Sequence, residues 1–281
     1  MRDSRSSGFQ LTALSGPLDG LTVVIHQWPV TIGRSTENTV ALQLDVWASR
    51  QHARLDYQDG QVWLEDMGDL NITAVGRQLV RGRVPLAPES TFRVGHTLIR
   101  LERVKEEAQA GPHTPPDTDG NPLDSSQFSP AVRQIVVTAI AESARMRHYS
   151  RGGEPLFFAA SQPGHALTQA LLHLGLQPDL IQARLRVEAG PGNLRRPWQG
   201  IILTPRADRL LARLAGARTT TPPASPVSEA ELASAILDDP DALPTRWLRQ
   251  QGYDPAALRT LLQEALPLAP KPVRARDAEP R

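Results

Sequence analysis

The feature that most constrains this chain is a change of hydrophobic period across one acidic, proline-rich segment. Residues 105–127 (KEEAQAGPHTPPDTDGNPLDSSQ) carry one Lys against five acids and four prolines. Before this segment, apolar and polar residues alternate; after it, apolar residues recur every three or four positions. Alternation is typical of half-buried strands and the longer period of amphipathic helices. We therefore expect a β domain, a flexible acidic linker over 105–127, and a helical domain.

The first hundred residues contain short alternating runs separated by turn residues such as Asp19-Gly20 and Asp59-Gly60. The runs are FQLTAL (9–14), LTVVIH (21–26), ARLDY (53–57), QVWLED (61–66) and TLIRLE (97–102). Several short strands at this spacing predict an all-β sandwich. Its expected span is 9–104, preceded by a flexible N-terminus over 1–8.

The second half repeats itself at an interval of about 75 residues. Ser129-Pro130 places a helix N-cap residue before a proline, and Thr204-Pro205 does the same again. Further on, a Gly175 and Pro178 pair is followed in the second copy by Gly252 and Pro255. An all-α domain over 128–266 is therefore expected to hold two repeats, 128–187 and 203–266, with a disordered tail over 267–281.

Composition excludes several classes of protein. The 281 residues include 31 Lys or Arg, 30 Asp or Glu and no Cys, which excludes disulfides, thiolate metal sites and a cysteine nucleophile. No stretch approaches the roughly 20 apolar residues that span a bilayer, and the net charge of +1 gives no pull toward nucleic acid or membrane. No GxxxxGK[ST], HExxH or GxSxG motif occurs. We expect a soluble, unexported, cytoplasmic protein that is not an enzyme and holds no metal or cofactor.

Hydrogen-bond donors gather in the predicted loops of the β domain. Gly33-Arg34, Ser49-Arg50-Gln51-His52 and Gly68-Asp69-Leu70-Asn71 lie between strand signals. The planar fork of arginine suits phosphate oxygens, and hydroxyl and amide groups can complete the shell. A phosphorylated threonine carries about −1.5 to −2 charges and three acceptor oxygens. The loops are therefore complementary to a phosphoamino acid, although Arg34 taken alone would be assigned to a solvated surface.

The ordered motifs IGRSTEN, SRQHA, DMGDLN and FRVGHTLIRL resemble the forkhead-associated (FHA) domain family over about residues 9–103. The resemblance implies a β-sandwich that binds phosphothreonine peptides without catalysing a reaction. It also implies a role for each matching residue. Arg34 and Ser49 would contact the phosphate, Arg50 would flank it and Asn71 would hold the peptide main chain, while Gly33 and His52 would shape the loops.

The chain departs from the family pattern at one loop. It has Asp69-Leu70-Asn71-Ile72 where the family has Ser-Thr-Asn-Gly, so a hydroxyl is replaced by leucine and a carboxylate is added. Like charge near a phosphate weakens binding. Gly76 and His96 also replace family residues. Two interpretations therefore stay open: phosphothreonine binding, and a degenerate FHA fold used for phosphate-independent protein contact.

The helical half resembles the Clp N-terminal (Clp R) double-repeat domain over about 128–266. FSPAVRQIVVTAIAESARMRHYSRGGEPLFFAA resembles its first repeat, and LTPRADRLLARLAGAR with WLRQQGYDPAALRTLL resembles its second. The second repeat lacks the His148-Tyr149 turn of the first. The resemblance implies a protein-binding module, with a Clp-type protease component or another protein as its partner.

These features predict a non-catalytic signalling adaptor that binds a phosphothreonine protein through one module and a second protein through the other. The linker would raise the effective concentration of one partner near the other. An intramolecular switch, in which phosphorylated Thr114 or Thr118 occupies the FHA site, is a third hypothesis. We expect Leu156, Phe157 and Phe158 to be core. Arg206 is expected in a solvated loop, and His165 and His173 are expected to form no metal site.

Overall fold

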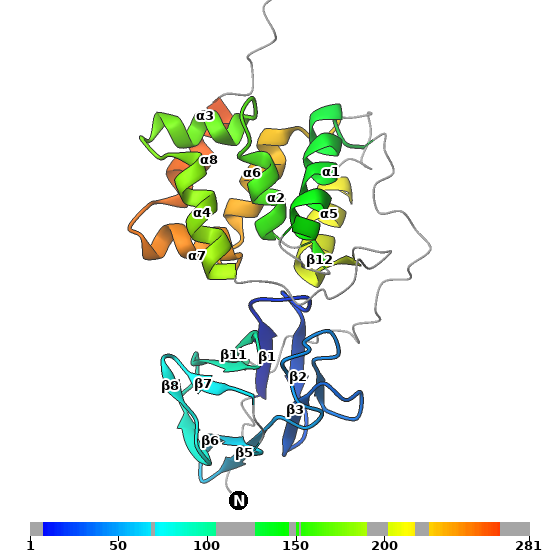
Figure 1. Cartoon of the computed structure of the whole chain (residues 1–281), viewed down its shortest axis with the longest axis vertical. Coiled ribbons are helices and arrows are strands. Elements are labelled where there is room, and N and C mark those ends of the chain that lie inside the picture. The colour runs from blue at the N-terminus through cyan, green and yellow to red at the C-terminus, as the bar shows by residue number, and fades with distance from the viewer. Residues whose placement is uncertain are drawn as a thin grey trace, which may run out of the picture.

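The computed structural model describes residues 8–68, 71–104, 127–145, 150–151, 153–189, 202–216 and 225–264. They form a β domain followed by a helical domain, stacked along the long axis of the molecule (Figure 1). The segments expected to be flexible, 1–8, 105–127 and 267–281, lie outside the described residues except for Gly8 and Gln127.

The β domain is a sandwich of two sheets. One sheet has the strand order β2-β1-β11-β10-β7-β8 and the other β4-β3-β5-β6-β9. The strands are β1 (Gly8–Ala13), β2 (Thr22–Ile25), β3 (Val30–Gly33), β4 (Val40–Ala41), β5 (Ala53–Gln58), β6 (Gln61–Asp66), β7 (Thr73–Val75), β8 (Gln78–Leu79), β9 (Arg83–Leu86), β10 (Thr91–Val94) and β11 (Thr97–Val104). The prediction of an all-β sandwich is confirmed.

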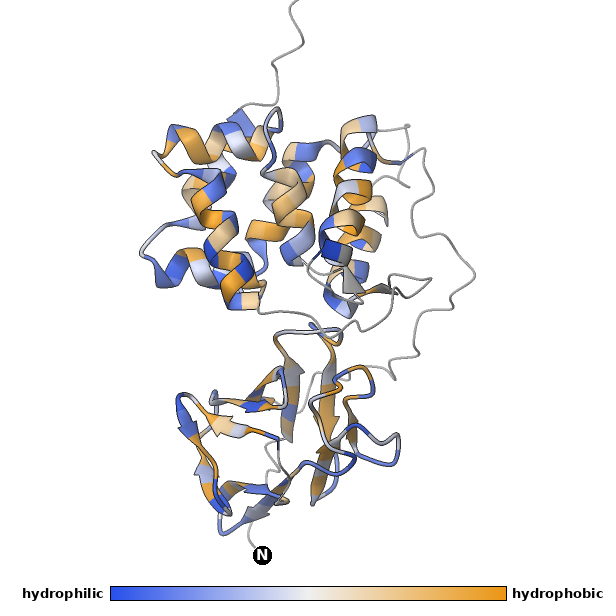
Figure 2. Cartoon of the chain, in the orientation of Figure 1, coloured by the Kyte–Doolittle hydropathy of each residue, from blue (hydrophilic) through white to orange (hydrophobic). Residues whose placement is uncertain are grey.

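Alternation along the strands fills the space between the sheets. In β5, for example, Ala53 and Leu55 are buried while Arg54 and Asp56 are half-buried. Strands in Figure 2 accordingly switch between hydrophobic and hydrophilic colours along their length. Phe92 is fully buried in this core, and Leu11, Ile32 and Leu64 are at most 2% exposed. Burial of this apolar surface, at about 25 cal/mol per Å², is the main stabilising contribution.

The helical domain contains eight helices within its described residues, in two sets of four separated by 190–201. Ser129 and Thr204 cap the first helix of each set as expected, accepting hydrogen bonds from Val132 N (3.3 Å) and Ala207 N (3.2 Å). The helices are α1 (Pro130–Arg145), α2 (Gly153–Ala160), α3 (Ala166–His173), α4 (Pro178–Ala189), α5 (Pro205–Gly216), α6 (Glu229–Asp238), α7 (Leu243–Gln250) and α8 (Pro255–Glu264).

Short parallel strand pairings connect the two sets of helices. Phe128, just before α1, pairs in parallel with Val227, just before α6. In the same way β13 (Ile202–Leu203), before α5, pairs in parallel with β12 (Ser150–Arg151), before α2. Helices of the two sets also pack against one another, since α2 contacts α7 and α6 contacts α3. The two sets of helices therefore pack as one intertwined unit around a common core.

The centre of this core is apolar, as the sequence predicts. Leu156, Phe157 and Phe158 on α2 are fully buried, and Ile236 on α6 is fully buried beside them. His165 at the start of α3 is held by a contact between the two sets of helices: its Nδ1 lies 2.6 Å from Glu229 Oε2. The same carboxylate accepts a hydrogen bond from Ala166 N at 3.1 Å, so Glu229 caps the start of α3.

The two domains contact one another directly. The turn between β1 and β2, together with Arg100 on β11, meets the start of α5 and the segment between α6 and α7 (Figure 1). Arg206, expected in a solvated loop, is 6% exposed and pairs with Asp19 of the β domain. That expectation was wrong, because the helix-opening Thr-Pro-Arg sequence places this side chain against another domain instead of water.

Candidate ligand site at one end of the sandwich

Three loops of the β domain are joined by backbone hydrogen bonds at one end of the sandwich. Arg34 N donates to Ser49 O at 2.7 Å, and Ser35 N donates to Arg50 O at 3.1 Å. On the other side of the 49–52 loop, Met67 N donates to His52 O at 3.0 Å. The sequence motifs that carry the predicted site residues are therefore neighbours in space.

Gly33 and His52 hold the 49–52 loop against β3. A Cβ at Gly33 would lie 2.5 Å from Arg50 O and 2.9 Å from Ser49 O, so only glycine permits this approach. The buried His52 accepts a hydrogen bond from Ser49 N on Nδ1 at 3.0 Å. Replacing either residue would move Ser49 and Arg50.

Ser49 and Asn71 form a direct pair. Asn71 Nδ2 donates to Ser49 Oγ at 3.1 Å, and the serine is buried while the asparagine is half-buried. This bond joins the loop before β5 to the segment before β7. Asp69 and Leu70, whose effect on phosphate binding the sequence left open, lie outside the described residues.

Arg34 and Arg50 are exposed residues of the loops that contain this pair. Arg34 Nε donates to Ala48 O at 3.2 Å, which orients the side chain along the loop. Within the part of the chain that the structure describes, neither arginine pairs with a carboxylate. Two exposed cations therefore lie in the connected loops of Ser49 and Asn71, without an internal anion among the described residues to neutralise them.

Sequence reasoning missed two residues that organise this end of the domain. Asn38 Nδ2 donates to Ser35 O (2.9 Å) and Arg50 O (2.7 Å), tying two loops together. The buried Asp45 accepts hydrogen bonds from Trp47 N (3.0 Å) and His96 N (2.9 Å). Asn38 lies inside the IGRSTEN motif and could have been suspected, whereas nothing in the sequence marks Asp45.

His96, which replaces a family residue in the β10–β11 turn, stacks on Trp47. Their ring centroids are 5.2 Å apart and the planes differ by 9°. Burial lowers the pKa of His96, assisted by Arg93 and opposed by Asp45, so the imidazole is neutral at pH 7. Both side chains remain exposed, and they add an aromatic surface to this end of the sandwich.

A cavity of about 370 Å³ adjoins Asn71. Its walls come from the segment between β6 and β7 and from β8 with the residues after it, and include Asp66, Ile72, Leu79 and Arg81. No group of three or more His, Asp or Glu side chains that could hold a metal occurs among the residues in the described ranges. Among those residues, no helix is long and apolar enough to cross a membrane.

Loop motifs presented at one end of an eleven-stranded sandwich define a loop-based recognition domain. Residues 30–95 match the family model of the FHA domain, so the predicted FHA sandwich in the N-terminal part is confirmed. Over 100 residues the chain is 34% identical to the FHA domain-containing protein FhaB of Mycolicibacterium smegmatis and 33% identical to that of Mycobacterium tuberculosis. Each match covers 36% of this chain and 64% of the relative, which is less than two thirds of its length.

Two solved structures are also similar to part of this chain. A structure from a structural and functional analysis of phosphothreonine-dependent FHA domain interactions is 25% identical, with a TM-score of 0.31, and the match covers 34% of this chain and 96% of that one. The FHA domain of the CT664 protein from Chlamydia trachomatis is also 25% identical, with a TM-score of 0.32 and coverages of 34% and 97%. The C-terminal half is helical, and its Clp N-terminal identity stays a prediction.

Proposed function

We propose that the FHA domain of this chain binds phosphothreonine-containing protein segments and that the chain acts as a non-catalytic signalling adaptor. The observation that carries the proposal is that two exposed arginines, Arg34 and Arg50, lie in the hydrogen-bonded loops that also contain the Ser49–Asn71 pair. Two guanidinium groups and a hydroxyl match the charge and the three acceptor oxygens of a phosphate. FhaB proteins and the FHA domain studied for phosphothreonine-dependent interactions support the proposal by similarity.

Each assigned residue has a distinct role in this proposal. Arg34 and Ser49 contact the phosphate, Arg50 flanks it, and Asn71 holds the peptide main chain while it buttresses Ser49. Arg34 is already oriented by Ala48 O through its Nε, which leaves its two terminal nitrogens to form a bidentate pair with phosphate oxygens. The cavity beside Asn71 lies next to this position.

The proposal is tested with a pool of nonapeptides that carry a fixed central phosphothreonine, compared with the same pool carrying threonine. Isothermal titration calorimetry on the best-binding sequence should give measurable affinity only for the phosphorylated form. Arg34→Ala should remove that selectivity. Arg77→Ala is the matched control, because Arg77 is also exposed but lies in the β7–β8 turn, outside the site loops. Equal binding by wild type and Arg34→Ala would overturn the assigned site.

The competing function is phosphate-independent protein contact by a degenerate FHA domain. It predicts that the chain captures its partner equally well before and after phosphatase treatment of the partner. Asp69 motivates this alternative, because the sequence has a carboxylate where the family pattern has a hydroxyl, and like charge weakens phosphate binding. Loss of capture after phosphatase treatment would reject it.

We further propose that the helical domain binds a second protein. Exposed apolar side chains on two adjacent helices support this role: Leu172, Leu174, Leu180 and Val187 are 41–80% exposed along α3 and α4. Exposed apolar side chains are typical of interaction sites when they form one patch. Leu180→Glu should reduce capture of the second partner without changing phosphopeptide affinity, whereas Arg34→Ala should do the reverse. A Leu180→Glu chain that captures the same proteins would contradict this surface.

A further inference from the structure

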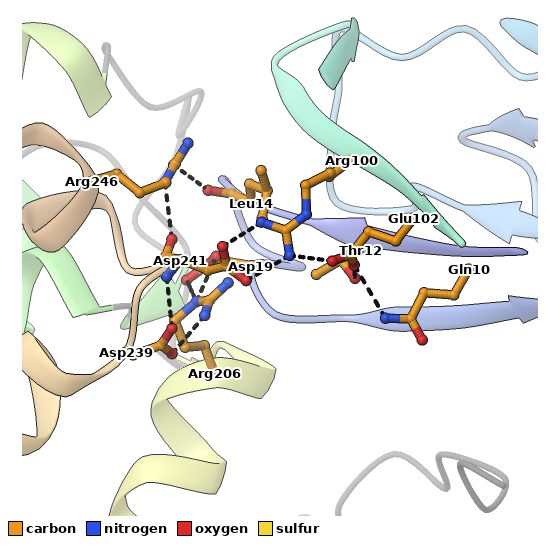
Figure 3. A network of polar contacts seen from close by, with 10 residues as sticks. All are labelled: Gln10, Thr12, Leu14, Asp19, Arg100, Glu102, Arg206, Asp239, Asp241 and Arg246. Atoms are coloured by element: carbon orange, nitrogen blue, oxygen red, sulfur yellow. Dashed lines mark hydrogen bonds and ion pairs between the residues drawn. The ribbon is translucent and has the colours of Figure 1, made fainter. Parts of the chain in front are cut away.

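The contact between the two domains is built from buried ion pairs. Arg206 Nε, at the start of α5, donates to both carboxylate oxygens of Asp19 at 2.9 and 3.0 Å, and Arg206 Nη1 donates to Asp239 at 2.6 Å (Figure 3). The Asp19 and Arg206 side chains are 3% and 7% exposed. Charges removed from water to this extent require partners, so each one fixes the position of the other.

A second set of pairs lies beside the first. Arg100 of β11 makes a bidentate contact with Asp241 and also donates to Glu102 at 2.7 Å (Figure 3). Arg246 of α7 bridges from the carbonyl of Asp241 (3.0 Å) to the carbonyl of Leu14 (2.9 Å). Arg100 and Arg206 thus each pair with one carboxylate of the other domain and with one carboxylate of their own.

The closest approach is at Gly20 in the β1–β2 turn. Its φ is +85°, and a Cβ at this position would lie 2.7 Å from Arg206 Cβ and 2.8 Å from Arg206 N. The carbonyl of Gly20 accepts a hydrogen bond from Arg209 Nη2 at 2.7 Å. The docked arrangement therefore requires glycine here for both its backbone conformation and its lack of a side chain.

The β1–β2 turn lies at the same end of the sandwich as the candidate phosphate site. Ala13 at the end of β1 pairs with Ile99 near the start of β11, which places the β10–β11 turn beside the β1–β2 turn. Ser15 Oγ donates to His96 O at 3.3 Å and accepts from Leu98 N at 3.0 Å. The docking turn and the turn that carries His96 are therefore bonded directly.

From His96 a continuous series of hydrogen bonds reaches Arg34. His96 N donates to Asp45 Oδ2 at 2.9 Å, and Ala48 N donates to Asp45 O at 3.0 Å. Ala48 O then accepts from Arg34 Nε at 3.2 Å. Only short loops and one buried carboxylate separate the domain contact from the exposed guanidinium group.

We propose that docking of the helical domain holds the phosphate-binding loops of the FHA domain in their binding geometry, with Asp45 as the positioning residue between the two. This inference rests on the proposed phosphothreonine binding. Docking and ligand binding then favour the same conformation, so each strengthens the other by the same factor. The helical domain is in this respect a part of the ligand-binding unit as well as a second module.

The test compares two glycine variants of the same turn in the full chain. Gly20→Ala introduces a side chain into the domain contact, whereas Gly16→Ala introduces the same backbone strain where the nearest atom, Thr97 Oγ1, is 3.8 Å away. We expect Gly20→Ala to separate the domains and to weaken binding of the selected phosphothreonine peptide by at least about fivefold. Gly16→Ala should leave domain separation and affinity within about twofold of wild type.

Domain separation is followed by fluorescence energy transfer between dyes on two introduced cysteines. The chain has no Cys, so Arg77→Cys and Gln169→Cys, both at exposed positions, create the only labelling sites. Arg206→Glu is a second separating variant, because it places a third carboxylate beside Asp19 and Asp239. Circular dichroism verifies that strands and helices remain in each variant.

Asp45→Asn tests the positioning residue. It should lower affinity while energy transfer stays at the wild-type value, and it should add little to the loss caused by Gly20→Ala because both act on one series of contacts. Unchanged or tighter peptide binding in separated domains would overturn the inference, as would domains that neither Gly20→Ala nor Arg206→Glu separates. A wild-type chain that docks but binds no phosphothreonine peptide would overturn the proposed function and this inference with it.

Discussion

Two groups of arginines in the β domain and its contact surface are used in opposite ways. Arg34 and Arg50 at the ligand end are exposed, and among the described residues no carboxylate neutralises them. Arg100 and Arg206 at the domain contact are half-buried or buried, and each pairs with two carboxylates. The difference separates cations that remain available to an external anion from cations whose anion is internal.

The exposed and the buried arginines also differ in how much they contribute to stability. An exposed arginine contributes little to stability until a ligand arrives, because water solvates it well. A buried arginine with its carboxylate is costly to break, since removing one partner leaves the other charge without solvent. Substitutions in the first group should therefore change binding and leave folding intact, and substitutions in the second should change the relation between the domains.

The largest effect is expected for Arg206→Ala. It leaves the Asp19 carboxylate buried without its partner, which costs about 3–5 kcal/mol in the docked state. We expect the domains to separate, with loss of energy transfer between labels at Arg77→Cys and Gln169→Cys. Arg209→Ala is the milder comparison, because Arg209 is exposed and donates to the single carbonyl of Gly20. Identical energy transfer in wild type and Arg206→Ala would show that the buried Arg206–Asp19 pair does not hold the domains together.

The next largest effect, a loss of phosphopeptide affinity, is expected for Arg34→Ala. Loss of charged hydrogen bonds to phosphate costs about 1.5–3 kcal/mol, or roughly 10- to 150-fold in affinity. Thermal unfolding should be unchanged within about 0.5 kcal/mol, because the side chain is exposed. Calorimetry and scanning calorimetry on one sample measure both quantities. A large loss of stability would show that Arg34 is structural and would place it with the second group.

Domain contact should also depend on pH through Asp19. Burial raises the pKa of the Asp19 carboxyl from 3.8 to about 7. The groups that face it are Arg206 and Arg246, which lower the pKa, and Glu154, which raises it. The docked carboxyl binds a proton more readily than the separated one, so docking weakens as pH rises from about 4 to 7 and is constant above that. The Asp19–Arg206 contact is then a full ion pair only above about pH 7, and below it a protonated Asp19 still accepts the hydrogen bond of Arg206.

The expected slope is at most about tenfold in the docking equilibrium per pH unit, because one proton is involved. Energy transfer at a urea concentration that gives half docking measures it between pH 5 and 8. Asp19→Asn should flatten the profile, since an amide does not titrate and Asp239 still pairs with Arg206. A profile that rises with pH, or that Asp19→Asn leaves unchanged, would contradict this assignment.

The smallest effect on stability is expected for Arg54→Ala, which removes an exposed ion pair instead of a buried one. Arg54 pairs with Asp56 at 3.0 Å, but its side chain is 41% exposed. Exposed ion pairs contribute about 0.2–1 kcal/mol. Chemical denaturation should detect a loss in that range, with docking and peptide affinity unchanged. A loss as large as that of Arg206→Ala would show that burial does not decide the strength of these pairs.

The FHA fold and the neighbourhood of its loops were predictable because each motif combines local turn chemistry with a required side chain. Gly33 and Ser49 belong to recognisable patterns, and the structure brings them into contact. The helix starts at Ser129 and Thr204 were equally visible, because capping depends on residues adjacent in sequence. Local rules therefore identified most of the elements and the position of the candidate site.

The domain contact was not predictable for the opposite reason. Asp19 and Arg206 are 187 residues apart, and no sequence motif contains both of them or predicts their contact. Asp19-Gly20 reads as an ordinary turn, and its glycine is explained equally well by a positive φ. The role of Asp45 was unpredictable for the same reason, since its carboxylate accepts hydrogen bonds from backbone N–H groups of the distant β10–β11 turn. Pairings of this kind are set by the packing of complete domains.

The short strand pairings between the two sets of helices have a consequence for how this domain can be divided. Phe128, before α1, pairs with Val227 of the second set, and β12, before α2, pairs with β13, which precedes the second set. One set alone lacks these partners and about half of the shared core. Neither set can therefore be deleted alone, and the two behave as one obligate folding unit.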